Sequence, residues 1–319
     1  MQRHDLIVVT PVYEDVEASS RLFKELAAQF QGRLFIVAVD DGSVRQPLEV
    51  ASMVAAGVDG VVIKLRRNVG HQKAIAIGLS YVSDKLGPDQ RVVVMDSDGE
   101  DLPSTIPNLL ERLKSPDVDV AVAHRKSRVE SWRFKTFYAI YKRFFKMMSG
   151  RPISFGNFMA LKPRSVKRLV AMQELPIHVA GAVLASKLRT GVCPLDRGPR
   201  YAGQSKMNFV GLVLHGFKGL MVFAEDVLVR VGIACGLFAG LAFVCAVAAI
   251  MLKLLGISTP GWFSIAFGLL IVMLLQTGAL ALMTLMLTGV VRGGTVHLAT
   301  AYQDVIDEVL PTPALSHAQ

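Results

Sequence analysis

Two long apolar segments near the C-terminus constrain this 319-residue chain more than any other feature. Residues 231–252 and 254–291 contain no Asp, Glu, Lys or Arg, and only Lys253 separates them. About 20 apolar residues cross the core of a bilayer, so the pattern predicts two transmembrane helices, about 231–254 and 262–288. The alternative is a pair of buried core helices, but soluble helices of this length usually carry a polar stripe.

The basic residues beside these segments predict the orientation of the chain. Arg230 precedes the first span and Arg292 follows the second, whereas the turn at 255–261 has no Lys or Arg. Basic residues favour the cytoplasmic side. We therefore expect a multi-pass protein of the inner (cytoplasmic) membrane, with a cytoplasmic domain at 1–229 and a cytosolic tail at 292–319.

Two further features concern targeting and assembly. The first residues predict a short strand rather than a signal peptide. Gly232, Gly236 and Gly240 form a face of small residues on the first span, through which helices could pair in a homo-oligomer.

Residues 1–230 alternate between strand and helix patterns. Continuous apolar runs separated by helical patterns are typical of a mostly parallel α/β sheet covered on both faces. In such sheets ligands bind beyond the carboxyl ends of the strands. The predicted strands are 6–10, 34–40, 61–65, 92–96 and 118–125, and the predicted helices run to about 30 and over 46–56, 71–83 and 104–114.

The most informative polar stretch is VVVMDSDGED at 92–101, where a buried strand ends in an acidic cluster. Asp96 and Asp98 form a D-x-D pair, and carboxylates this close repel each other unless a cation separates them. Mg²⁺ and Mn²⁺ prefer oxygen ligands and keep positions open for phosphate oxygens. The pattern thus favours a metal that binds a diphosphate, and the alternative is a solvated acidic loop.

Other classes of nucleotide site and partner are disfavoured. The sequence has neither GxGxxG after the first strand nor GxxxxGK[ST], the glycine-rich signatures of dinucleotide and P-loop sites. The net charge of +9 is not accompanied by a DNA-binding signature, so we expect no nucleic acid. Basic surface beside a membrane attracts anionic headgroups and phosphorylated lipids.

Five segments in order resemble the inverting family 2 glycosyltransferases, which have a Rossmann-like GT-A fold. They are TPVYED (10–15), VDDGS (39–43), RNVGHQKAIAIGL (67–79), VMDSDGEDLP (94–103) and RYAGQSKM (200–207). With the two spans, the chain is similar to the polyprenyl-phosphate glycosyltransferases and dolichol-phosphate mannose synthases. The resemblance implies metal-dependent transfer, with Mg²⁺ or Mn²⁺, from a UDP- or GDP-linked sugar to a polyprenyl phosphate on the cytoplasmic face.

The resemblance also implies roles for particular residues. Asp96 and Asp98 match the metal-binding carboxylates, and Arg200 and Lys206 match a basic element that closes on the diphosphate. The alternative for Arg200 and Lys206 is a basic loop that faces lipid headgroups. The expected donor-binding residues are Pro11, Tyr13, Asp15, Ala38, Asp40, Ser97, Glu100 and Arg125.

Two segments predict helices in the membrane interface, near 130–148 and 207–225. The first interleaves aromatic and basic residues at helical spacing, and we expect Trp132, Arg133 and Lys135 to contact the acceptor or the membrane. The alternative is a core helix with a basic outer face.

The acceptor side of the resemblance is incomplete. Residues 154–164 lack the acidic residue that many relatives carry, and His178 is the nearest polar candidate for a general base. An ionised phosphate acceptor needs no base. Transfer to another lipid such as a diacylglycerol, and a non-catalytic membrane scaffold, both stay open. Processive polysaccharide synthesis is disfavoured because a QxxRW motif is missing.

Overall fold

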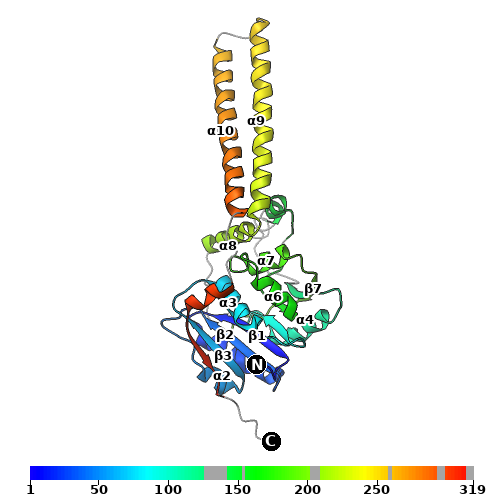
Figure 1. The fold of residues 1–319 in the computed structure, drawn as a ribbon, viewed down its shortest axis with the longest axis vertical. Coiled ribbons are helices and arrows are strands. Elements are labelled where there is room, and N and C mark those ends of the chain that lie inside the picture. Colours follow the sequence, from blue (N-terminus) through cyan, green and yellow to red (C-terminus); the bar gives the residue numbers. More distant parts are fainter. Residues whose placement is uncertain (126–141, 153–154, 202–208, 258–260, 293–298, 314–319) are drawn as a thin grey trace. The chain divides into compact units, whose positions relative to one another are not determined.

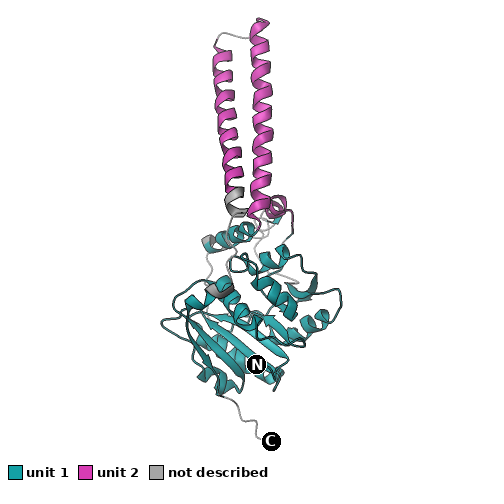
Figure 2. Ribbon diagram, viewed as in Figure 1, with its two compact units in different colours: residues 1–142, 152–222, 296–319 teal, residues 143–151, 223–295 magenta. Residues whose placement is uncertain are grey.

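The computed structural model describes residues 1–125, 142–152, 155–201, 209–257, 261–292 and 299–313. The chain divides into two compact units (Figure 2). Unit 1 comprises residues 1–142, 152–222 and 296–319, and unit 2 comprises residues 143–151 and 223–295. Unit 1 is an α/β domain, and unit 2 consists mainly of two long helices (Figure 1).

In the described residues, unit 1 is built on an eight-stranded sheet with the order β7-β5-β6-β4-β1-β2-β3-β8. Strands β1 to β4 pair in parallel, as do β5 and β7. The predicted, mostly parallel α/β sheet is therefore confirmed. The strands are β1 (Leu6–Val12), β2 (Leu34–Asp40), β3 (Asp59–Leu65), β4 (Arg91–Val94), β5 (Val120–Arg125), β6 (Met159–Leu161), β7 (Thr190–Leu195) and β8 (Ile306–Pro311).

Helices cover both faces of this sheet, because successive strand side chains point to opposite sides. Leu6 and Val8 of β1 belong to one buried cluster, which includes residues of α1, α2 and α4. Ile7 and Val9 belong to the other, which includes residues of α3, α6 and α7. The helices are α1 (Val16–Gln29), α2 (Ala51–Ala56), α3 (His71–Ser83), α4 (Ile106–Leu113), α6 (Pro163–Val170), α7 (Val179–Ala185) and α8 (Phe209–Met221), with a 3₁₀ turn η1 (Pro103–Thr105).

Two strands interrupt the parallel pattern. The short strand β6 lies between β4 and β5 and is antiparallel to both. Strand β8 comes from the segment expected to be a simple tail, follows the turn η2 (Ala299–Val305), and pairs antiparallel with β3. The Thr312 hydroxyl accepts a hydrogen bond from the Gly60 backbone N–H at 3.0 Å. Strand β8 thus covers the backbone edge that β3 would otherwise expose.

Unit 2 contains two helices that are long and apolar enough to cross a membrane, α9 (Ala224–Leu254) and α10 (Trp262–Arg292). They run antiparallel, side by side (Figure 1). Helix α9 begins earlier than the predicted position 231, since Glu225 and Asp226 form its first turn. Acidic residues there complement the helix dipole.

The glycine face of α9 serves only partly in packing the two helices. A Cβ added at Gly232 would lie 3.0 Å from the Thr284 hydroxyl of α10, so the two backbones approach closely there. At Gly236 and Gly240 a Cβ would meet no atom of the described residues within 4 Å. Pairing of this face in an oligomer stays a prediction.

The structure describes only part of the two segments predicted to be helices in the membrane interface. Residues 142–149 are helical, and Phe145 is buried edge-on against Phe223, with 6.0 Å between ring centroids. The remainder of 130–148, with Trp132, Arg133 and Lys135, lies outside the described residues. Helix α8 occupies most of the predicted segment 207–225.

Candidate active site

The acidic cluster forms a tight loop directly after β4. The Asp101 carboxylate accepts a hydrogen bond from the Asp96 backbone N–H at 3.0 Å, and the Asp98 carboxylate accepts one from the Glu100 N–H at 3.0 Å. Gly99 has φ +88°, a left-handed conformation that favours glycine. Asp101 therefore stabilises the backbone of the loop. The second carboxylate oxygen of Asp98 takes no part in the hydrogen bond to Glu100.

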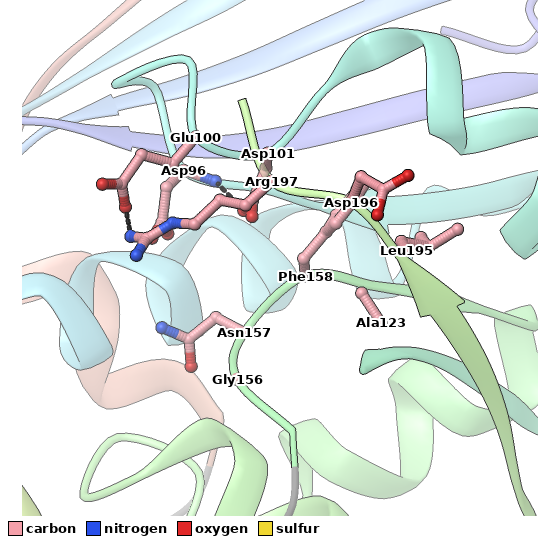
Figure 3. Close-up of a pocket in the computed structure, with 10 residues that line it drawn as sticks. All are labelled: Asp96, Glu100, Asp101, Ala123, Gly156, Asn157, Phe158, Leu195, Asp196 and Arg197. Atoms are coloured by element: carbon pink, nitrogen blue, oxygen red, sulfur yellow. Dashed lines mark hydrogen bonds and ion pairs between the residues drawn. The ribbon is translucent and has the colours of Figure 1, made fainter. Parts of the chain in front are cut away.

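A basic segment, residues 197–201, lies on this acidic loop. Arg200 Nη2 is 2.9 Å from Asp98 Oδ2, and Arg200 Nε is 3.1 Å from Glu100 Oε1. Arg197 also pairs with Glu100 (Figure 3). Backbone hydrogen bonds add to these ion pairs, from Gly198 N–H to Glu100 O at 3.0 Å and from Tyr201 N–H to Asp98 O at 2.9 Å.

Tyr201 fixes the end of the basic segment. A Cβ at Gly99 would lie 2.6 Å from the Tyr201 ring, so only glycine permits this approach. The Tyr201 hydroxyl donates to Glu25, and the Arg21 guanidinium lies 4.4 Å from the ring centroid. Burial raises the pKa of Tyr201, and the bond to Glu25 adds to this shift. The phenol is thus a neutral hydrogen-bond donor.

The closed arrangement leaves a cavity of about 20 Å³ beside the acidic loop, enough for roughly one water molecule. Its wall includes Asp96, Glu100, Asn157 and Arg197 (Figure 3). A nucleotide sugar is far larger than this cavity. The cavity between Arg197 and the acidic loop therefore holds no molecule of that size as it stands.

The donor set of this loop fits a hard divalent cation, because Asp96 and Asp98 offer only carboxylate oxygens. In the part of the chain that the structure describes, no three His, Cys, Asp or Glu side chains gather in a metal-binding group. The described residues alone would thus supply few ligands, so a cation here would need further oxygen ligands to complete its shell. Arg200, which now neutralises Asp98, is the group that such an ion would replace.

A polar network that the sequence analysis did not single out extends from Asp96 to α7. His71 Nε2 is 3.1 Å from Asp96 Oδ1 and 3.1 Å from Asn157 Nδ2. The Gln72 amide donates to Asn157 Oδ1 at 3.3 Å and accepts from the Val179 N–H at 2.6 Å. Partial removal from water opposes the charge on His71, whose side chain is 43% exposed, but Asp96 and the neighbouring carboxylates outweigh this effect and raise its pKa.

The acids at the end of β2, Asp40 and Asp41, are engaged mainly with backbone N–H groups. Asp40 is buried, and its two oxygens accept from Ser43 at 3.0 Å and Leu48 at 2.9 Å. Its recognition of a base or ribose stays a prediction. Burial raises the pKa of Asp41, although its carboxylate accepts from Val69 and Gly70.

Glu14 was not singled out from the sequence, yet it organises the same edge. Its carboxylate accepts from the N–H groups of Val44 at 2.8 Å, Arg45 at 3.1 Å and Gln46 at 2.8 Å. These hydrogen bonds lower the pKa of Glu14.

The other predicted donor residues occupy different environments. Pro11, Ala38 and Ser97 are buried, whereas Tyr13 is 43% exposed. Asp15 caps α1 by accepting from the Ala18 N–H at 3.3 Å. Arg125 is the last residue of β5, and its side chain lies outside the described part, as does all of Lys206.

His178 is a helix cap rather than an exposed base. Its Nδ1 accepts from the Gly181 N–H at 3.0 Å, and its Nε2 lies 3.2 Å from His215 Nε2 on α8. Burial, together with His215 and Lys218, lowers the pKa of His178 to about 3. This imidazole is neutral near pH 7.

Comparisons with known proteins agree with this architecture. The model of the family described as glycosyl transferase family 2 matches residues 7–169. The uncharacterized glycosyltransferase YkcC of Bacillus subtilis is 27% identical over 295 residues, 88% of this chain and 87% of that protein. An undecaprenyl-phosphate 4-deoxy-4-formamido-L-arabinose transferase of Sodalis glossinidius is 29% identical over 216 residues, 65% of this chain and 64% of that protein.

A solved structure shares the fold. Glucosyl-3-phosphoglycerate synthase of Mycobacterium tuberculosis, in complex with Mn²⁺, UDP-glucose and phosphoglyceric acid, superposes with a TM-score of 0.50 at 15% identity. The match covers 70% of this chain and 80% of the synthase. The predicted GT-A fold is thereby confirmed.

Proposed function

The chain belongs to glycosyl transferase family 2, and we propose that it transfers a sugar from a nucleoside diphosphate sugar to a polyprenyl phosphate at the cytoplasmic face of the membrane. The family makes the chain a glycosyltransferase. Our proposal adds the nucleotide-sugar donor, the lipid acceptor, the metal dependence and the inner-membrane location.

The observation that carries the proposal is the contact between Arg200 and Asp98 at the carboxyl edge of the sheet, 2.9 Å apart. A carboxylate and a guanidinium side by side suit the two halves of a metal–diphosphate complex, since the carboxylate binds the cation and the guanidinium binds phosphate oxygens. The ion pair between Arg200 and Asp98 would therefore break when the donor and its metal ion bind.

The residues present suggest how the reaction would proceed. Asp96 and Asp98 would hold a Mg²⁺ or Mn²⁺ ion, whose chemistry is the neutralisation of charge on the departing diphosphate. Arg200 and Lys206 would bind the same diphosphate. An oxygen of the lipid phosphate would attack the anomeric carbon and form the new bond. The bond to the nucleoside diphosphate breaks with its electron pair, and the configuration inverts.

No general base is required in this scheme. A phosphate monoester is ionised near neutral pH, so its oxygen needs no proton removed. The buried, neutral His178 supports this view, because its Nδ1 already accepts the Gly181 N–H. The lack of a carboxylate in residues 154–164 is then no obstacle to transfer.

The lipid acceptor and the location are supported by α9 and α10, which are long and apolar enough to cross a membrane. A polyprenyl tail needs a bilayer, and its phosphate lies at headgroup depth. The chain leaves unit 1 at Val222 and re-enters it before β8, so two spans would return it to the same side. Arg230 and Arg292 favour the cytoplasm for that side.

The test is transfer by the purified full-length protein in phospholipid vesicles that contain undecaprenyl phosphate. A panel of radiolabelled UDP- and GDP-sugars is supplied with Mn²⁺, and the lipid fraction is extracted. We expect label in a glycosyl undecaprenyl phosphate with one donor. Label in a diacylglycerol product would indicate another lipid acceptor. No transfer and no Mn²⁺-dependent binding of nucleoside diphosphates would identify a non-catalytic scaffold.

A further inference from the structure

The hydrogen bond between His178 and His215 has a defined direction. His178 Nδ1 accepts the backbone N–H of Gly181, so the proton of the neutral His178 ring is on Nε2. That Nε2–H donates to His215 Nε2, at 3.2 Å. The neutral His215 ring therefore carries its own proton on Nδ1. The cap of α7 thus determines which nitrogen of His215 is a donor.

Helix α8 presents three different surfaces around its axis. Leu214, Phe217 and Met221 are 54%, 57% and 59% exposed and form one apolar stripe at helical spacing. Leu220 is buried. With 3.6 residues per turn, Lys218 falls between the stripe and His215 around the helix. The order across the surface is apolar stripe, lysine, imidazole.

The position of α8 in the chain indicates what covers the apolar stripe. Only Val222 and Phe223 separate its last residue from α9, the first helix able to cross a membrane. An amphipathic helix that adjoins a membrane span is suited to lie in the headgroup region, with its apolar side toward the lipid. Lys218 would then lie at the depth of the lipid phosphates.

His215 also lies near the acidic loop. Burial lowers the pKa of His215, the His71 ring and Lys218 add to this shift, and Asp96 acts in the opposite direction. Hydrogen bonds link the two regions, because Val179, next to His178, donates its N–H to Gln72 at 2.6 Å, and the neighbouring His71 lies 3.1 Å from Asp96. The start of α3 therefore joins the histidine pair to the acidic loop, where the donor would bind.

From these positions we propose that His215, oriented by His178, donates a hydrogen bond to the phosphate of the lipid acceptor, with Lys218 neutralising its charge. This inference rests on the proposed function, since it assigns the acceptor side of the same reaction. The ligand class is a phosphate monoester on a membrane-bound lipid. A neutral donor suits this role because it holds the anion and leaves the attacking oxygen unprotonated.

The test uses the full-length protein in phosphatidylcholine vesicles with Mn²⁺ and a saturating nucleotide sugar, and varies undecaprenyl phosphate. In His215→Ala we expect the KM for undecaprenyl phosphate to rise about tenfold to a hundredfold, as for loss of a hydrogen bond to a charged group. The Kd for the nucleoside diphosphate with Mn²⁺ should stay within twofold of wild type, because the donor is bound elsewhere.

Two further variants separate orientation from folding. His178→Asn keeps a good helix cap but removes the imidazole whose Nε2 lies against His215, so we expect a smaller rise in the same KM. His4→Gln is the matched control, since His4 lies before β1, where it contacts Asp59. This control should leave the KM unchanged.

Each outcome decides a different question. If wild type transfers no sugar to undecaprenyl phosphate, the proposed function itself fails. If wild type transfers and His215→Ala keeps the wild-type KM for the acceptor, only this inference fails. A parallel rise in the nucleoside diphosphate Kd would assign His215 to the donor and overturn it. Competition by phosphatidylglycerol vesicles, lost in His215→Ala, would show a general headgroup site and overturn it as well.

Discussion

Arg200 Nη2 lies 2.9 Å from Asp98 Oδ2, and so occupies the carboxylate oxygen that a divalent ion would require. The ion pair is only partly exposed, with 28% and 17% of the two side chains accessible. Binding of a metal and a diphosphate must therefore exchange one set of charge pairs for another.

Asp98→Asn should abolish metal-dependent binding of the nucleoside diphosphate. The amide keeps the shape but loses the charge that holds a divalent cation, so we expect Mn²⁺ affinity in the presence of the diphosphate to fall about a hundredfold or more. Isothermal titration calorimetry measures it. Asp117→Asn, at an exposed aspartate, is the matched control and should bind normally. Wild-type Mn²⁺ affinity in Asp98→Asn would exclude Asp98 as a ligand.

Glu100→Gln should loosen the basic segment. Glu100 pairs with both Arg197 and Arg200, and the neutral amide removes both ion pairs. We expect faster cleavage by trypsin after Arg197 and Arg200, by roughly threefold to tenfold, and slower cleavage once Mn²⁺ and UDP or GDP are bound. Mass spectrometry locates the cuts. Glu111→Gln removes an exposed ion pair with Lys114 and serves as the control. Equal rates in all three proteins would mean that Glu100 does not hold the segment.

The fold was largely predictable from local patterns. The β1, β2 and β3 segments are continuous apolar runs, and the acidic loop follows β4 directly, so the carboxyl edge of the sheet could be identified from the sequence. Family resemblance added Arg200. Each of these signals lies within a few neighbouring residues.

The missed features are all contacts between distant segments. Glu14 binds the backbone of residues 44–46, and His71 meets Asp96 and Asn157 across three elements. Nothing in the residues around Glu14 or His71 specifies such partners, since both are ordinary surface types at loop or helix ends. Strand β8 was missed for the same reason, because only pairing with β3 makes its sequence a strand.

Acidification should weaken the start of α7. His178 has a folded pKa of about 3, against an ordinary value near 6.5, so between these values the unfolded chain binds a proton that the folded one does not. Its contribution to stability is complete above about pH 6.5 and is lost as the pH falls toward 3. Between pH 6.5 and 5 the loss is about 2 kcal/mol. His215 and Lys218, which face this ring, both oppose its protonation.

Hydrogen exchange at the Gly181 amide measures this effect, because that N–H donates to His178 Nδ1. We expect protection, corrected for intrinsic exchange, to fall from pH 7 to pH 5 in wild type. His178→Asn should retain constant protection, since an asparagine cap does not titrate. The same pH dependence in both proteins would contradict the assignment.

Removal of β8 should destabilise unit 1 without detaching the protein from membranes. Strand β8 pairs with five residues of β3 and is the last strand at that edge. If about three net hydrogen bonds are lost at roughly 1 kcal/mol each, the thermal midpoint should fall by on the order of 10 °C. The exposed edge of β3 should also promote aggregation.

Truncation after Val305 is compared with truncation after Pro313, which keeps β8, by thermal unfolding in detergent and by membrane flotation. Helices α9 and α10 are intact in both truncated proteins, so both should float with vesicles. Equal midpoints in the two proteins would show that β8 contributes nothing to the sheet, and would make the return of the chain to β3 irrelevant to stability.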